Sequence, residues 1–170
     1  IVVDIELTAQ LELALTQING REKQIIVIPC HEHEAPRCHF SEEVLYDDFL
    51  GRGDLHDSWV LPESEWEAYG LNETSGTGGT PKGVVIHHRG AYLMAMGTVP
   101  AWNVPQHPVY LYTVPMFHCN GWGHAWLNAL VAGSIICLKK INASAIFDAI
   151  SEHKVTHFGG APVVLGLLIN

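Results

Sequence analysis

One short stretch of the chain gathers the residue types that hold a phosphate group. It reads Thr74-Ser75-Gly76-Thr77-Gly78-Gly79-Thr80-Pro81-Lys82-Gly83. Glycines let backbone N–H groups surround an anion, hydroxyls donate further hydrogen bonds, and the Lys82 ammonium neutralises charge. An ordinary surface turn also uses Gly-Gly and Thr-Pro pairs, so composition alone leaves a phosphate loop and a turn both open.

The order of residues in this stretch excludes one common kind of phosphate loop. The nucleotide loop G-x-x-x-x-G-K-[ST] needs a metal-binding hydroxyl directly after its lysine, whereas Gly83 follows Lys82 here and Pro81 precedes it. The same order disfavours another phosphate-binding α/β protein such as a kinase. The sequence also contains no acidic metal motif that matches a kinase.

Three further segments belong with this loop. They are His88-Arg89-Gly90-Ala91-Tyr92-Leu93, Pro115-Met116-Phe117-His118-Cys119-Asn120-Gly121-Trp122 and His157-Phe158-Gly159-Gly160-Ala161-Pro162. Together with the loop they make the chain resemble the adenylate-forming (AMP-binding) synthetases and ligases. Within that family it is most similar to the plant-type acyl-activating enzymes, acid–CoA ligases such as benzoate or fatty acid–CoA ligase. The resemblance is strong over residues 66–170 and thin over residues 1–65.

The resemblance implies a reaction in two steps. A carboxylate attacks the α-phosphate of ATP to give an acyl-adenylate and pyrophosphate, and coenzyme A then displaces AMP to give a thioester. The implied cofactors are ATP, Mg²⁺ and coenzyme A, with the Mg²⁺ ligands expected outside this chain. The implied partners are small molecules, among them a fatty or aromatic carboxylic acid. The implied compartment is the cytoplasm or the peroxisome.

Site residues follow from the same resemblance, position by position. It gives Lys82 a catalytic role at the phosphates, and it gives His118 a role in steering the carboxylate or in gating between the two steps. The implied ATP-binding residues are Thr74, Ser75, Gly76, Thr77, Gly78, Gly79, Thr80 and Lys82. The implied acid-binding residues are His118, Asn120, Gly121, Gly160 and Ala161.

Ordinary structural roles stay open for several of these positions. His118 can be a hydrogen-bonded loop histidine, and Gly160 with Ala161 can form a turn beside apolar core. Cys119 next to His118 suggests a nucleophile pair. Neighbours in sequence usually point in different directions, however, and no orienting acid is identifiable, which disfavours covalent cysteine catalysis.

Three residues depart from the pattern of the family that the chain resembles. Glu73 places a carboxylate next to a loop meant for polyanions, which weakens ATP binding unless its side chain points away. Gly78 replaces a threonine and so removes a hydroxyl donor. His87 replaces a small hydroxyl residue, which we expect to remove a good helix N-cap.

Hydrophobic periodicity predicts alternating strands and helices. The expected strands lie at residues 1–3, 25–28, 84–86, 109–113, 134–138 and 155–158. The expected helices lie at residues 7–18, 88–99, 122–131 and 142–153, the last with Asn142 or Ser144 as N-cap. This alternation favours an α/β fold with an open, mostly parallel sheet and flanking helices. Ligands in such sheets bind at the carboxyl ends of the strands.

We expect residues 1–170 to form an incomplete part of the large N-terminal domain of an adenylate-forming enzyme. Residues 29–70 are polar and aperiodic, which predicts a long variable loop with a short helix near residues 42–50. The chain opens on Ile1 and closes on an apolar run, so we expect a piece of a longer enzyme. The alternative is a truncated, non-catalytic product that binds a partner through exposed surfaces.

Charge and cysteine content argue against other classes. The formal net charge is -9 with only nine Lys and Arg residues, which argues against nucleic-acid binding. No apolar run in the sequence reaches membrane-spanning length.

The four cysteines do not have the short, regular spacing of a disulfide-rich domain, so reduced thiols are favoured over disulfides. A zinc site is disfavoured because its candidate ligands have the spacing of no ordinary closed site; they are Cys30, His31, His33, Cys38 and His39.

Overall fold

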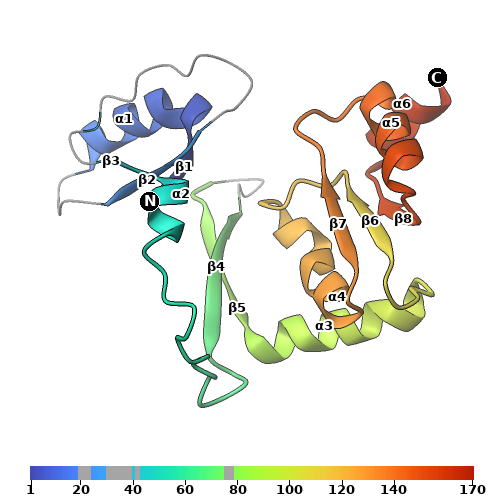
Figure 1. Cartoon of the computed structure of the whole chain (residues 1–170), viewed down its shortest axis with the longest axis horizontal. Coiled ribbons are helices and arrows are strands. Elements are labelled where there is room, and N and C mark those ends of the chain that lie inside the picture. The colour runs from blue at the N-terminus through green and yellow to red at the C-terminus, as the bar shows by residue number, and fades with distance from the viewer. Residues whose placement is uncertain (19–23, 30–39, 41–42, 75–78) are drawn as a thin grey trace. The chain divides into compact units, whose positions relative to one another are not determined.

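The computed structural model describes residues 1–18, 24–29, 40, 43–74 and 79–170. The chain divides into two compact units, Ile1–Val60 and Leu61–Asn170 (Figure 1). Strands alternate with helices in both units, which confirms the predicted α/β class.

The first unit is a small parallel sheet whose first two strands are joined through a helix. Its elements are β1 (Val2–Asp4), η1 (Ile5–Leu7), α1 (Thr8–Gln17), β2 (Ile25–Ile28), β3 (Glu43–Leu45) and α2 (Tyr46–Leu50). The strands pair in the order β1-β2-β3, all parallel. Ile25 and Val27 are two residues apart on β2 and share one face, where they form a buried core with Ile5.

Strand β3 lies inside the region that the sequence predicts to be a loop with a short helix. The helix is present as α2, but the strand was not predicted. Val44 is half-buried between the exposed residues Glu43 and Leu45. A strand of three residues carries no readable period, and its pairing with β2 satisfies backbone groups that local sequence does not report.

The second unit opens with an antiparallel hairpin of β4 (Ala68–Thr74) and β5 (Lys82–His87). The sequence predicted part of β5, at residues 84–86, and missed β4. Gly70, Asn72 and Glu73 are residue types that are depleted in strands, so local propensity argues against β4. Pairing with β5 overrides that propensity, and the register runs from Ala68 opposite His87 to Thr74 opposite Lys82.

A second parallel sheet follows, in the strand order β7-β6-β8. The remaining elements are α3 (His88–Ala101), β6 (Val109–Tyr112), η2 (Cys119–Gly123), α4 (His124–Leu130), β7 (Ser134–Cys137), α5 (Ala143–His153), β8 (His157–Gly159) and α6 (Pro162–Ile169). The helix predicted at residues 122–131 begins only at His124, because the backbone of η2 is left-handed. Asn142 caps α5 as predicted, since its Oδ1 accepts from the N–H of Ala145 at 2.9 Å.

Side chains of the central strand β6 alternate between two packed faces. Leu111 is fully buried with Ile146 of α5 and Val164 of α6. Tyr110 and Tyr112 point to the opposite face. The Tyr110 ring centroid lies 4.9 Å from that of His124 at the start of α4. Helices therefore cover both faces of this sheet, as the class of parallel sheets requires.

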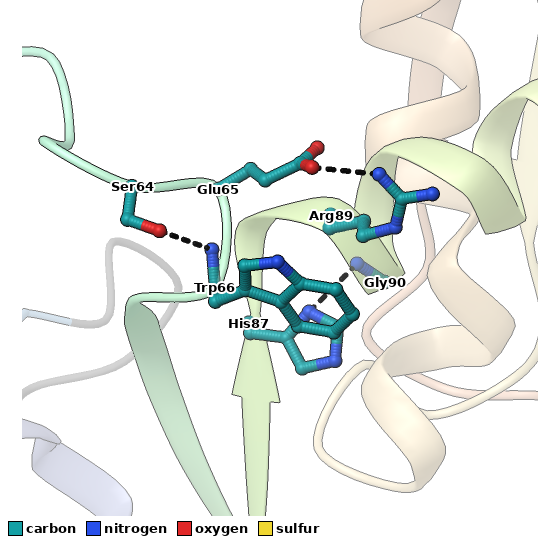
Figure 2. A network of polar contacts seen from close by, with 6 residues as sticks. All are labelled: Ser64, Glu65, Trp66, His87, Arg89 and Gly90. Atoms are coloured by element: carbon teal, nitrogen blue, oxygen red, sulfur yellow. Dashed lines mark hydrogen bonds and ion pairs between the residues drawn. The ribbon is translucent and has the colours of Figure 1, made fainter.

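The start of α3 corrects the expectation that His87 removes a helix cap (Figure 2). His87 is the N-cap residue, and its Nδ1 accepts from the N–H of Gly90 at 3.0 Å. The first two helical residues find acceptors in the preceding loop. The N–H of His88 donates to the Glu67 carbonyl at 3.2 Å, and the N–H of Arg89 donates to the Glu65 carbonyl at 2.8 Å. An imidazole and a preceding loop thus replace the small hydroxyl residue that usually satisfies a helix start.

Aromatic and charged contacts hold the same loop against the helix. The Trp66 ring centroid lies 5.1 Å from that of His87, and the Arg89 guanidinium carbon lies 5.4 Å from the Trp66 ring centroid. Arg89 also forms an ion pair with Glu65 at 2.6 Å (Figure 2). The ion pair is partly exposed and contributes little by itself, so the cap and the ring contacts carry most of the stabilisation.

The cap role of His87 can be measured. We expect His87→Ala to lower the free energy of unfolding by about 1 kcal/mol, because the Gly90 N–H loses its acceptor. His87→Asn should lower it less, since asparagine is a good N-cap residue. Denaturant unfolding of the chain provides the measurement. Equal losses in the two variants would show that the imidazole does not act as a cap.

Candidate active site

The described residues of the phosphate loop lie where β4 and β5 are joined. Thr74 ends β4 and Lys82 begins β5, and the two pair directly across the hairpin. Residues paired in this way share a face, so the structure places a hydroxyl and an ammonium side by side on an exposed surface. Gly79 and Thr80 are also exposed. The other predicted loop residues lie outside the described residues; they are Ser75, Gly76, Thr77 and Gly78.

The hairpin register answers the question raised by Glu73. Side chains alternate along a strand, so Glu73 lies on the face opposite to that of Thr74 and Lys82. Glu73 pairs with Gly83, which has no side chain to share that face. The Glu73 and Lys82 side chains therefore start from opposite faces of the hairpin, which reduces the expected repulsion, although Glu73 still contributes to the cavity described below.

A left-handed turn carries the second group of predicted residues. The backbone φ angles of Cys119, Asn120, Gly121, Trp122 and Gly123 lie between 49° and 69°. Such conformations cost energy in residues other than glycine, and a run of them persists only where the surroundings hold it. Here the Gly121 N–H donates to the His118 carbonyl at 3.0 Å, and the Tyr112 hydroxyl donates to the Gly121 carbonyl at 3.4 Å.

Gly121 is required at the centre of this turn. A Cβ at Gly121 would lie 2.6 Å from a ring carbon of Tyr112, and the residue has a φ of 56°. Both the close approach and the backbone conformation favour glycine. Gly121 is buried, and it is not among the lining residues of the two cavities described below.

The hairpin and the turn enclose a cavity of about 340 Å³, which we call the hairpin cavity. It brings together two of the predicted acid-binding residues, His118 and Asn120, with Thr74 of the phosphate loop. Asn72 was not predicted, yet its Nδ2 donates to Asn120 Oδ1 at 2.5 Å and joins the two walls. The full lining is Asn72, Glu73, Thr74, Val84, Ile86, Phe117, His118, Cys119 and Asn120.

A second cavity of about 420 Å³, the apolar cavity, is also lined by His118. It brings together His118 and Ala161, two of the residues predicted to bind the acid, and most of its other side chains are apolar. Gly160 lies beside it, where a Cβ would meet Val164 at 3.3 Å. The lining is Thr113, Val114, Pro115, His118, Trp122, Ile141, Ala161, Val163, Val164 and Leu167. His118 therefore lines both cavities.

A buried network of hydrogen bonds fixes both loops to strand β6. The Tyr110 hydroxyl accepts from the Gly159 N–H at 3.2 Å and forms a short bond with Nδ1 of His124. The Thr113 hydroxyl donates to the Gly159 carbonyl through another short bond. Gly159 precedes Gly160 and Ala161, which were predicted to bind the acid, and His124 directly follows the left-handed turn. Strand β6 thus sets the distance between the two loops of the site.

Burial determines the protonation states in this network. Loss of solvent raises the pKa of Tyr110 to about 12, and burial lowers the pKa of His124 from 6.5. A neutral hydroxyl can donate to a neutral imidazole, and because the hydroxyl already accepts from Gly159, we assign its proton to the bond with Nδ1. Sequence analysis missed both residues, although Tyr110, two positions before Tyr112, belongs to the same face of a predicted strand.

The neighbours His118 and Cys119 do not form a nucleophile pair with the usual support. Cys119 Sγ lies 3.8 Å from His118 Nε2, and both side chains are exposed. Within the described part of the chain no carboxylate hydrogen-bonds to His118, so the group that would orient it as a base is missing there. The zinc alternative concerns residues 30–39, which lie outside the described residues.

Comparison with known proteins settles the family. The family model described as "AMP-binding enzyme" matches residues 2–170. The chain belongs to the AMP-binding enzyme family. A 2-methylpropanoate–CoA ligase of Humulus lupulus is 51% identical over 125 residues, which are 74% of this chain and 22% of that protein. A peroxisomal acetate/butyrate–CoA ligase of Arabidopsis thaliana is 48% identical over 125 residues, with the same coverage of 74% and 22%.

Solved structures share the fold of this chain. The luciferase-like enzyme of the mealworm Zophobas morio superposes with a TM-score of 0.75 at 18% identity, covering 99% of this chain and 37% of that one. The chain spans only 22% of the length of the two curated relatives. Its membership of the AMP-binding enzyme family is therefore shown for this part of such an enzyme. No helix among the described residues is long and apolar enough to cross a membrane.

The buried His124 predicts a dependence of stability on pH. Because its folded pKa lies below 6.5, the unfolded chain binds more protons in acid, and stability falls as pH drops below 6.5. We expect His124→Gln to flatten this fall, by at most about 1.4 kcal/mol per pH unit. Denaturant unfolding across the acid range measures both slopes. Parallel slopes, together with a wild-type His124 NMR titration at or above 6.5, would contradict the buried neutral state.

Proposed function

We propose that the native protein containing this chain joins a carboxylic acid to coenzyme A through an acyl-adenylate. One carboxylate oxygen forms a bond to the α-phosphorus of ATP, the bond between the α- and β-phosphates breaks, and pyrophosphate leaves. The thiolate of coenzyme A then bonds to the acyl carbon, and AMP leaves with that carboxylate oxygen. Membership of the AMP-binding family and the names of the plant relatives support this reaction class.

The observation that carries the proposal is that His118 lines both cavities. The hairpin cavity has Thr74 on its wall, beside the directly paired Lys82, which suits a chain of phosphates. The apolar cavity suits the tail of an acid. A carboxylate whose tail fills the apolar cavity would meet the phosphates at His118, whose ring N–H can donate to it.

The side chains at the hairpin do not fit a metal site. Thr74 and Lys82 offer a hydroxyl and an ammonium, whereas Mg²⁺ prefers carboxylate and water oxygens. Glu73 is the one carboxylate residue in the described lining of the hairpin cavity, and it starts from the strand face opposite to theirs. We therefore derive no step through the metal from these residues. A Mg²⁺ ion that accompanies ATP would take its protein ligands elsewhere.

The substrate class follows from the apolar cavity and the relatives. One relative is named for 2-methylpropanoate and another for acetate and butyrate, so short aliphatic acids head the candidates, with longer fatty acids and benzoate after them. A peroxisomal or cytoplasmic location is part of the same proposal, since one of these relatives is named as peroxisomal.

Exchange of labelled pyrophosphate into ATP by the native product tests the proposal. We expect exchange only when a carboxylate is present, and thioester formation when coenzyme A is added. ATP cleavage to ADP, or exchange that ignores the acid, would overturn it. The alternative of a truncated, non-catalytic product predicts a native product near the size of this chain and no exchange with any acid.

Removing the ammonium of Lys82 should weaken the interaction with the phosphates. We expect Lys82→Ala to reduce kcat/KM for ATP by about ten-fold or more, because it loses a charge-assisted hydrogen bond. Val85→Thr is a matched control, since Val85 is an exposed residue of the same strand on the opposite face. Unchanged pyrophosphate exchange in Lys82→Ala would contradict the role given to Lys82.

Removing the imidazole of His118 should affect the acid more than the nucleotide. We expect His118→Ala to raise KM for the carboxylate by about ten-fold while KM for ATP changes much less, because the ring donates to a charged acceptor. His153→Gln, at an exposed histidine near the end of α5, is the control. Equal effects on both substrates would indicate that His118 only supports the loop.

A further inference from the structure

We propose that Asn72 is a positioning residue that couples the binding of ATP's phosphates to the binding of the acid. The inference rests on the proposed function, because it needs both ligands in neighbouring parts of one site. Its starting point is the hydrogen bond from Asn72 Nδ2 to Asn120 Oδ1, at 2.5 Å, between residues 48 positions apart. This bond connects β4, the strand that leads into the predicted phosphate loop, with the left-handed turn η2, which begins directly after His118.

On the hairpin side, Asn72 is tied to the phosphate-binding face. It pairs with Val84, and Thr74, the first residue of the phosphate loop, pairs with Lys82. Asn72 and Thr74 are two positions apart on β4, so their side chains share a face. A displacement of Thr74 and Lys82 toward a bound phosphate therefore moves the strand segment that holds the Asn72 amide.

On the turn side, Asn120 is held rigidly to His118. Asn120 has a φ of 51°, a left-handed conformation that asparagine tolerates better than most residues. The hydrogen bond from the Gly121 N–H to the His118 carbonyl closes the backbone around Asn120 at 3.0 Å. A displacement of the Asn120 backbone therefore also moves the backbone of His118, the residue that the proposed function places beside the acid.

Both amides are half-buried at the wall of the hairpin cavity, where water competes only in part for their hydrogen bond. A ligand that orders one side lowers the ordering cost of the other, because the two sides share this bond. Coupling of this kind is reciprocal, so the acid should tighten nucleotide binding by the same factor as the nucleotide tightens acid binding. A single hydrogen bond of this type supports a factor of about 2 to 10.

Equilibrium binding to the native product tests the coupling. The probe is α,β-methylene-ATP, which cannot release pyrophosphate, titrated with and without saturating butyrate. We expect butyrate to tighten binding about 2- to 10-fold in the wild type and to have no effect in Asn72→Ala. Asn120→Gly keeps the left-handed backbone and should also abolish the tightening of nucleotide binding by butyrate. The double variant Asn72→Ala with Asn120→Gly should behave like either single variant.

The matched control is Leu71→Ala, an exposed residue next to Asn72 on the opposite face of the hairpin. It should keep the wild-type coupling factor. Coupling that survives in Asn72→Ala, or that Leu71→Ala removes equally, would overturn the proposal.

A second measurement needs no ligand and separates this inference from the proposed function. Amide hydrogen exchange of residues 117–124 in the ligand-free protein should be faster in Asn72→Ala than in the wild type and in Leu71→Ala. Unchanged protection would overturn the positioning role even in an active enzyme. Loss of protection in a protein that fails pyrophosphate exchange with every acid would instead support the positioning role while the proposed function fails.

Discussion

The hydrogen bonds made by strand β6 are the constraint on which the site depends. The Tyr110 hydroxyl forms hydrogen bonds with the His124 imidazole and with the Gly159 N–H. The hydroxyl of Thr113, the residue just past the strand, donates to the Gly159 carbonyl. One strand therefore fixes the end of the left-handed turn η2, through His124, and the loop that follows β8. Leu111, between the tyrosines, is buried on the other face, so a shift of register would expose core and break the network together.

Much of the fold and part of the site could be predicted from sequence. The strand at residues 25–28 and the Asn142 cap could be predicted because they depend on local sequence preferences. The residue types around Lys82 and His118 indicated which side chains are candidates for binding phosphate and a carboxylate. Strand β4 was missed because its residues favour turns and only pairing with β5 makes it a strand. The His87 cap was missed because histidine is not a usual N-cap residue, and only the structure shows its Nδ1 accepting from Gly90 while its ring packs beside Trp66.

The contacts that sequence could not supply are those between distant segments. The sequence around Asn72 does not indicate its hydrogen bond with Asn120. Predicting that contact requires knowing which face of β4 Asn72 lies on and that Asn120 lies in a left-handed turn. The two cavities that share His118 depend in turn on those elements. The sequence therefore nominated residues that could carry chemistry, and the structure adds which of them line the same cavity.

The central claim is that a carboxylate meets the α-phosphate of ATP beside His118. The most direct measurement uses a carboxylic acid labelled with oxygen-18 in its carboxylate, incubated with the native product, ATP and coenzyme A. Mass spectrometry of the nucleotide then follows the label. The account predicts that one labelled oxygen appears in AMP, because that oxygen bonds to the α-phosphorus and leaves with it. Label in inorganic phosphate with formation of ADP would contradict the account.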